Sequence, residues 1–203
     1  MSMWKAYSVI ILLMLMSTAN AAVVVTISDL KPIVEAVAGD KIEVVSILPP
    51  GTDPHHFSLS IENVRTLHSA ELIVLANSEL FGFEKKIKEE FTNVLDFTDY
   101  NAELEDFPNY PQNPHGYWLK PKNAIGIAKA VCEKLSEMYP EKREYFEKNL
   151  RDFSKKIEES VREAKKIASE FRGKKFVAAV PGVCYIATSL DIDIAAVLLS
   201  EGS

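Results

Sequence analysis

Short apolar runs alternate with segments of helical periodicity along the first half of this chain. The runs predict strands at 23–27, 41–48, 72–76 and 93–97. Between them, apolar residues recur at intervals of three and four, and these segments predict helices at 29–38, 60–69 and 83–91. Such alternation is typical of a parallel sheet with crossover helices, so the predicted fold class is α/β.

The pattern changes after residue 121. A helix is predicted over 122–139, and beyond Pro140 one unbroken amphipathic helix is predicted from Glu141 to Phe171. At 1.5 Å per residue such a helix measures roughly 46 Å, which is long enough to connect two bodies. We interpret its charged positions as a solvated face, with a coiled-coil partner as the alternative. The elements predicted after it are a strand at 175–180, a helical stretch at 185–189 and a strand from Asp191.

These elements predict an N-terminal lobe at 22–120, a helical connector at 121–172 and the start of a second α/β lobe at 173–203. Residues 1–21 have the features of an export signal, because Lys5 precedes an apolar run and Ala19-Asn20-Ala21 ends it with small residues. The run is shorter than the roughly 20 residues of a spanning helix, so cleavage is expected, with an uncleaved anchor as the alternative. The export signal predicts an extracytoplasmic protein, periplasmic or secreted. No cysteine lies near the cleavage site, so no lipid anchor is expected.

Composition narrows the possible partners. With 47% hydrophobic residues the chain has ample material for a core, and its net charge of −6 argues against nucleic acid as a partner while remaining compatible with cations. Cys132 and Cys184 could form a disulfide in an oxidising compartment. Each lies within an apolar pattern, however, so buried thiols are the preferred interpretation.

Two histidine motifs carry the candidate chemistry. They are Thr52-Asp53-Pro54-His55-His56-Phe57 and Asn113-Pro114-His115-Gly116-Tyr117-Trp118, and they contain three of the four histidines of the chain. Each places an imidazole directly after a proline, whose fixed φ orders the loop before a ligand arrives. His55 and His115 are therefore candidate metal ligands at one edge of the sheet. An oxygen acceptor is expected beside each ring to orient it, although the sequence does not name that acceptor.

The order of several motifs resembles one known family. The motifs are Gly39-Asp40-Lys41, Pro50-Gly51-Thr52-Asp53-Pro54-His55, Ala70-Glu71-Leu72-Ile73-Val74, Pro114-His115 with Trp118-Leu119, and Gly173-Lys174-Lys175-Phe176-Val177. With an export signal and a long helix, this order is similar to the metal-binding solute-binding proteins of ABC importers for zinc and manganese, the ZnuA and TroA type or cluster A-I. The resemblance implies a bilobal fold with a backbone helix, one divalent metal ion in the cleft as the transported ligand, and a membrane permease as partner of a monomer. It maps the first two ligands to His55 and His115.

The sequence departs from this family at the remaining ligands. Val180 stands where the resemblance places a third histidine, and the second motif has one extra residue, within Gly116-Tyr117, before its tryptophan. The family's fourth ligand is an acidic residue far along the second lobe. The chain ends at Ser203 before that point, so a truncated C-terminal lobe is expected.

Other candidate donors have local explanations. Cys184 and Asp191 could replace missing ligands, but a packed thiol and a turn residue are the preferred interpretations. His56 is interpreted as solvent-exposed or as a neighbour of the site, and His68 as a surface histidine. The loop 99–114 contains no histidine and is acidic. This composition weakens the case for zinc as the bound metal, but it does not decide between zinc and manganese.

Three classes of function therefore compete. The leading prediction is a binding protein that captures zinc or manganese for an ABC importer, and the alternative is a truncated, degenerate relative that binds metal weakly or not at all. A metallohydrolase is the third class. No His-Glu-x-x-His or Gly-x-Ser-x-Gly motif occurs in the sequence, so we predict that the protein is not an enzyme.

Overall fold

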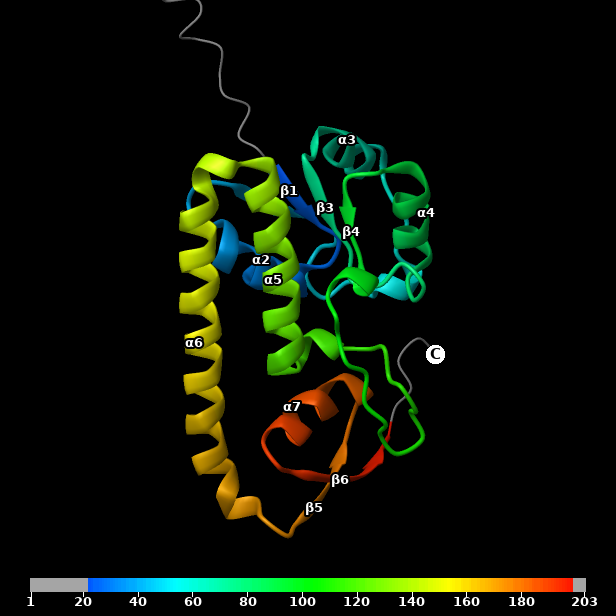
Figure 1. Ribbon diagram of the computed structural model, residues 1–203. Coiled ribbons are helices and arrows are strands. Elements are labelled where there is room, and N and C mark those ends of the chain that lie inside the picture. The colour runs from blue at the N-terminus through cyan, green and yellow to red at the C-terminus, as the bar shows by residue number, and fades with distance from the viewer. Residues whose placement is uncertain (1–21, 199–203) are drawn as a thin grey trace, which may run out of the picture.

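The apolar runs of the first lobe form a parallel sheet, as predicted. In the computed structural model, which describes residues 22–198, the strands pair in the order β2-β1-β3-β4 (Figure 1). Their bounds are β1 (Ala22–Val25), β2 (Glu43–Ser46), β3 (Leu72–Val74) and β4 (Val94–Leu95). Val24 of β1 lies opposite Val45 and Ile73 in the two neighbouring strands. The predicted signal peptide, residues 1–21, falls outside the described residues.

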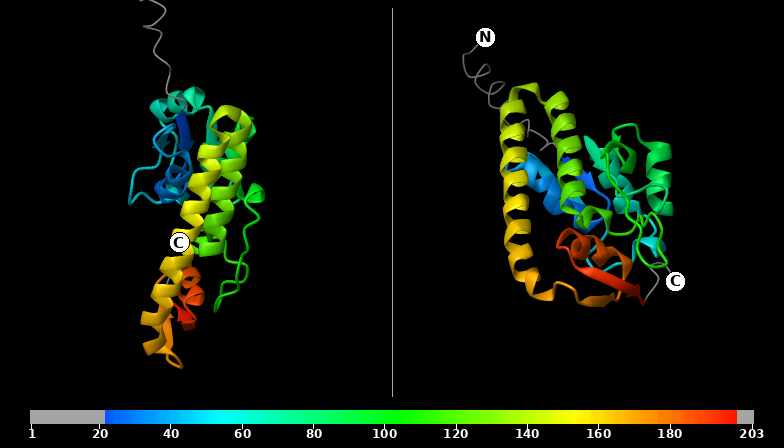
Figure 2. Two further views of the ribbon diagram at one scale, coloured as in Figure 1. Left: turned by 60° about the vertical axis from the view of Figure 1, so that its left-hand side comes forward. Right: turned by 60° about the horizontal axis from the view of Figure 1, so that its bottom comes forward.

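Helices cover both faces of this sheet, which explains why its central strands are continuous apolar runs. The helices are α2 (Lys31–Ala38), α3 (Ile61–Ser69), α4 (Gly82–Glu90) and α5 (Pro121–Met138). Helices α2 and α5 lie on one side of the sheet, and α3 and α4 lie on the other (Figures 1 and 2). Val24 and Ile73 are accordingly inaccessible to solvent.

The chain leaves the two central strands in opposite directions. After β1 it passes through α2 to β2, and after β3 it passes through α4 to β4, so the loops at the carboxyl ends of β1 and β3 diverge. Open α/β sheets bind ligands at such a switch point, because the diverging loops leave a crevice there. The fold thus offers a site at the edge where His55 is expected.

The predicted long helix is α6 (Arg143–Ala168), and it continues without a break through Asp152. It is shorter than predicted because its two ends tighten into 3-10 turns, at Pro140–Lys142 and Ser169–Phe171. Its first half packs against α2 and α5. Its second half extends past the second lobe (Figure 1), where Lys165 forms an ion pair with Asp191 at 2.8 Å.

The second lobe contains two parallel strands, β5 (Lys175–Ala178) and β6 (Asp193–Val197), joined through α7 (Cys184–Ser189). Strand β5 ends earlier than predicted because Pro181 begins a 3-10 turn. Helices α6 and α7 both line an apolar groove of about 410 Å³, to which α2 and α5 also contribute.

The cysteines, two short 3-10 turns and the lengths of the helices can be compared with the sequence predictions. Cys132 and Cys184 are both buried thiols, as preferred. The first helix begins with a 3-10 turn at Ser28–Leu30, and a turn at Tyr117–Leu119 was not predicted. No helix within 22–198 is both long enough and apolar enough to cross a membrane.

The contact between α5 and the loop after β4 is testable through Gly126. A Cβ atom at this position would lie 2.5 Å from the backbone oxygen of Tyr100. We expect Gly126→Ala to lower the free energy of unfolding by about 1–3 kcal/mol, because this clash outweighs the gain in helix propensity. Urea unfolding measures the change. Gly82→Ala is the control, since a Cβ atom there meets open space, and equal stability of the two variants would contradict this packing.

Candidate metal site

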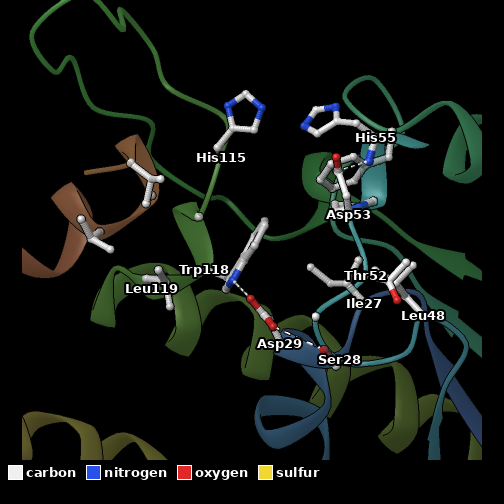
Figure 3. Close-up of a pocket in the computed structure, with 17 residues that line it drawn as sticks. Ile27, Ser28, Asp29, Leu48, Thr52, Asp53, His55, His115, Trp118 and Leu119 are labelled. Atoms are coloured by element: carbon white, nitrogen blue, oxygen red, sulfur yellow. Dashed lines mark hydrogen bonds between the residues drawn. The ribbon is translucent and has the colours of Figure 1, made fainter. Parts of the chain in front are cut away.

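His55 and His115 lie side by side at the carboxyl edge of the sheet, as the sequence predicts (Figure 3). His55 belongs to a 3-10 turn, Pro54–His56, in the loop that follows β2. His115 lies in the long loop before α5. The ring centroids are 5.2 Å apart and the planes are inclined by 44°. Zinc binds imidazole nitrogen at about 2.1 Å, so this separation suits joint ligation of one ion.

The loop that carries His55 is held by Asp53. One carboxylate oxygen of Asp53 accepts a hydrogen bond from the backbone N–H of His55 at 2.9 Å. The other lies 2.8 Å from Nδ1 of His56. These contacts lower the pKa of Asp53, with the bond to the His56 ring contributing most. The His55 ring packs edge-on against Phe81, with 5.1 Å between the ring centroids, which restricts its rotation.

The oxygen acceptor expected beside His115 is the side chain of Asn113. Oδ1 of Asn113 lies 3.2 Å from both the backbone nitrogen and Nδ1 of His115, while Nδ2 donates to the His115 carbonyl at 3.0 Å. The backbone bonds fix which end of the amide is oxygen. A ring nitrogen that faces this oxygen carries the proton, so His115 is the Nδ1-protonated tautomer. The lone pair is then on Nε2, which is the nitrogen left to bind a metal.

Burial keeps His115 neutral. Removal of the ring from water lowers its pKa below the usual 6.5, and the neighbouring charge of His55 lowers it further. Only a neutral imidazole has a lone pair to offer a cation. The lowered pKa thus favours the form of His115 that can coordinate a cation.

Both histidines open onto a cleft of about 750 Å³. Its walls come from both lobes, and the second lobe contributes Val180, Gly182 and Val183. Asp29 also lines the cleft, but Figure 3 shows its carboxylate turned toward Trp118, whose Nε1 donates to it at 3.2 Å. A ligand in this cleft would be enclosed between the lobes.

Comparison with known proteins identifies the family. The model of the family described as "ZnuA: Zinc-uptake complex component A periplasmic" matches residues 23–203. The chain belongs to this family. Among curated relatives, the manganese ABC transporter substrate-binding lipoprotein PsaA of Streptococcus pneumoniae is 30% identical over 183 residues, covering 83% of this chain. The chain spans 58% of the length of that lipoprotein.

Solved structures show the same fold. Zn(II)-bound AdcA from Streptococcus pneumoniae superposes with a TM-score of 0.74 at 24% identity, over 89% of this chain and 40% of AdcA. A Mn-bound periplasmic metal binding protein from Candidatus Liberibacter asiaticus gives 0.72 at 20% identity, over 86% of this chain and 68% of that one. These likenesses confirm the α/β architecture with its parallel sheet and long helix.

The other candidate donors named from the sequence do not line the cleft with the histidine pair. His56 is 74% exposed beside Asp53, and His68 of α3 is exposed beside Glu90 at 3.4 Å. Cys184 and Asp191 do not line the cleft. Across the described part of the chain, no group of three or more His, Cys, Asp or Glu side chains is arranged to hold a metal ion.

Sequence reasoning missed the buried acid below this site. Glu84 is inaccessible to solvent, and its carboxylate accepts bonds from the backbone of Ala76 at 2.9 Å and Asn77 at 2.7 Å and from the hydroxyl of Thr26. It therefore joins the carboxyl ends of β1 and β3 at the switch point. An acidic residue in the first turn of a helix is ordinary, so the sequence carries no distinct signal for this role.

Glu84 gives a testable pH dependence. Burial raises its pKa from 4.5 to about 7, so the folded chain binds this proton more tightly than the unfolded chain. The stabilisation that results is complete below about pH 4.5 and is lost as the pH rises through 7. Glutamine cannot ionise, so the stability of wild type relative to Glu84→Gln should fall by about 2 kcal/mol between pH 5 and 7.

Urea unfolding at several pH values in this window measures the difference. The matched control is Glu89→Gln, which alters an exposed acid on the same helix and should leave the pH profile of the wild type unchanged. Parallel profiles for wild type and Glu84→Gln would show that Glu84 does not titrate in this range.

Proposed function

We propose that this chain is the cargo-binding part of an extracytoplasmic solute-binding protein, which captures a zinc or manganese ion and delivers it to the membrane permease of an ABC importer. The observation that carries the proposal is the His55–His115 pair, whose ring centroids are 5.2 Å apart in a cleft between two lobes. Membership of the ZnuA family supports it. The PsaA and AdcA relatives are named for manganese transport and for bound Zn(II).

The two rings are prepared for capture in different ways. Asp53 and Phe81 restrain His55, while Asn113 holds the proton of His115 on Nδ1 and leaves Nε2 to the ion. Because these contacts restrain both loops, little ordering entropy should be lost when an ion binds. Two neutral imidazoles leave the remaining positions of the ion to water, which favours modest affinity and ready release.

The degenerate-relative alternative rests on Val180. Its side chain lines the cleft at the position where the family resemblance implies a third imidazole, and an aliphatic group cannot coordinate a cation. The two proposals differ in affinity, because a degenerate relative would bind metal more weakly still or not at all. We also infer that the protein is a non-enzymatic monomer, that it does not bind nucleic acid, and that its parts divide at 22–120, 121–172 and 173–203.

The first test removes each imidazole in turn. Wild type should bind one zinc or manganese ion weakly in a calorimetric titration at neutral pH, and binding should be lost as the pH falls, because protonation removes the lone pairs. His55→Ala and His115→Ala should each weaken binding by about 10–100-fold or more, since each removes a direct ligand.

His68→Ala is the matched control, because this ring lies on α3 beside Glu90 and outside the cleft. It should bind as the wild type does. Tight binding that survives His115→Ala would mean that other donors form the site.

The second test restores a third imidazole. Val180→His should raise the affinity for zinc at least about tenfold, equal to roughly 1.4 kcal/mol, because a third nitrogen donor replaces one bound water. Calorimetry at neutral pH measures the gain. Val177→His places the same side chain on an exposed position of β5 outside the cleft and should give no gain. Equal affinities of the two variants would contradict the assignment of Val180 to the site.

A further inference from the structure

A buried tyrosine of the second lobe reaches the loop that carries His115. Tyr185 lies in α7 and is inaccessible to solvent. Its hydroxyl donates to the backbone carbonyl of Asn113 and accepts from the backbone N–H of Glu105 at 3.2 Å. The hydroxyl thus donates one hydrogen bond and accepts another, and both partners lie in one loop of the first lobe. The ring of Phe107 packs edge-on against Tyr185, with 5.0 Å between the centroids, and fixes its direction.

The loop transmits this contact directly to the metal-site histidine. Glu105 and Asn113 are joined by a backbone bond of 3.0 Å, so the hydroxyl of Tyr185 closes the base of a loop whose two ends are already paired. Asn113 is 1% exposed and supplies the oxygen that faces Nδ1 of His115. A displacement of the Asn113 backbone would therefore move the atom that determines where the His115 proton lies.

Two more contacts between the lobes surround the same segment. Thr188 of α7 donates to the Glu105 carboxylate at 2.8 Å. Gly116, directly after His115, has φ +70° and touches the second lobe so closely that a Cβ atom would lie 2.6 Å from Cα of Gly182. Second-lobe atoms thus contact the chain on both sides of His115.

A second tyrosine shows what the first lobe contributes. The hydroxyl of Tyr117 donates to the Ala76 carbonyl at 2.6 Å, which anchors the turn after His115 to the end of β3. The residue before Pro114, in contrast, takes its backbone anchor from α7. His115 is held between one tether from each lobe.

We propose that Tyr185 is a positioning residue of the metal site: its hydroxyl holds Asn113 so that His115 presents Nε2 to the cleft, which makes a ligand of the first lobe dependent on the second. The inference rests on the proposed function for its consequence in metal affinity. The effect on the His115 ring itself does not need a metal. A shift of α7 would therefore change the donor geometry of the first lobe without any contact between α7 and the ion.

The test compares wild type with Tyr185→Phe, which removes one hydroxyl and keeps the ring. Long-range ¹H–¹⁵N NMR correlations of the metal-free chain near pH 8 report the tautomer of His115. Wild type should show the proton on Nδ1, and Tyr185→Phe should show a mixture of both tautomers with about tenfold weaker binding of zinc chloride. Retention of the wild-type tautomer in Tyr185→Phe would overturn the proposal.

Tyr100→Phe is the matched control. Its hydroxyl is equally buried and donates to the Leu75 carbonyl at 2.6 Å, directly after β3, and not to the segment 105–115. It should lose stability and keep both the tautomer and the zinc affinity. A change of tautomer in Tyr100→Phe would show that general loosening causes the effect, which would also overturn the proposal.

If Tyr185→Phe does not fold, Thr188→Val tests whether contacts from α7 set the tautomer of His115. It removes the neighbouring second-lobe bond to Glu105, and a smaller shift of the His115 tautomer in the same direction is expected, whereas an unchanged tautomer would overturn the proposal. If the tautomer depends on Tyr185 but wild type binds neither zinc nor manganese, the positioning role stands and the proposed function fails.

Discussion

Glu84 joins the two central strands at the point where the chain turns to opposite sides of the sheet. The loops after β1 and β3 diverge there, and the backbone N–H groups of Ala76 and Asn77 after β3 would otherwise be buried without acceptors. The Glu84 side chain accepts from both, and also from the hydroxyl of Thr26 after β1, so it links the ends of the two strands. Tyr117 then donates to the carbonyl of Ala76, which ties the segment after His115 to the same place. The position of the His115 segment therefore depends on this junction.

The two lobes have unequal shares in the site. The first lobe supplies both rings, the proline-ordered loops and the acid below them. The second supplies Val180 to the wall of the cleft and the hydroxyl of Tyr185 to the loop of Asn113. Under the proposed function, the first lobe would bind the ion and both lobes would set the geometry of its ligands. The contacts between the lobes around His115 are hydrogen bonds of the Tyr185 and Thr188 hydroxyls and one close glycine contact.

Much of this arrangement could be predicted because it depends on local pattern. Val24 and Ile73 lie in apolar runs because both faces of their strands are buried, and α6 follows the spacing of its apolar residues. The Pro-His pairs located His55 and His115 because proline restricts the backbone before each ring. The roles of Asn113, Glu84 and Tyr185 could not be predicted, since each depends on segments that meet only in the folded chain; Tyr185 and Asn113 are 72 residues apart. The ends of α6 were missed because turns of 3-10 helix continue the same periodicity.

The length of helix α6 limits which insertions and deletions this architecture can accept. It is the continuous element between the first sheet and β5, and each of its 26 residues advances the chain by 1.5 Å and turns it by about 100°. Insertion of one residue in its middle would swing α7 around the helix axis and carry Tyr185 away from Asn113, even though every local contact within each lobe survived. Only changes close to whole pairs of turns, such as seven residues, would restore the facing, and these would lift the second lobe by about 10 Å. The length of α6 therefore sets the rotation of the second lobe relative to the first as well as the distance between the two lobes.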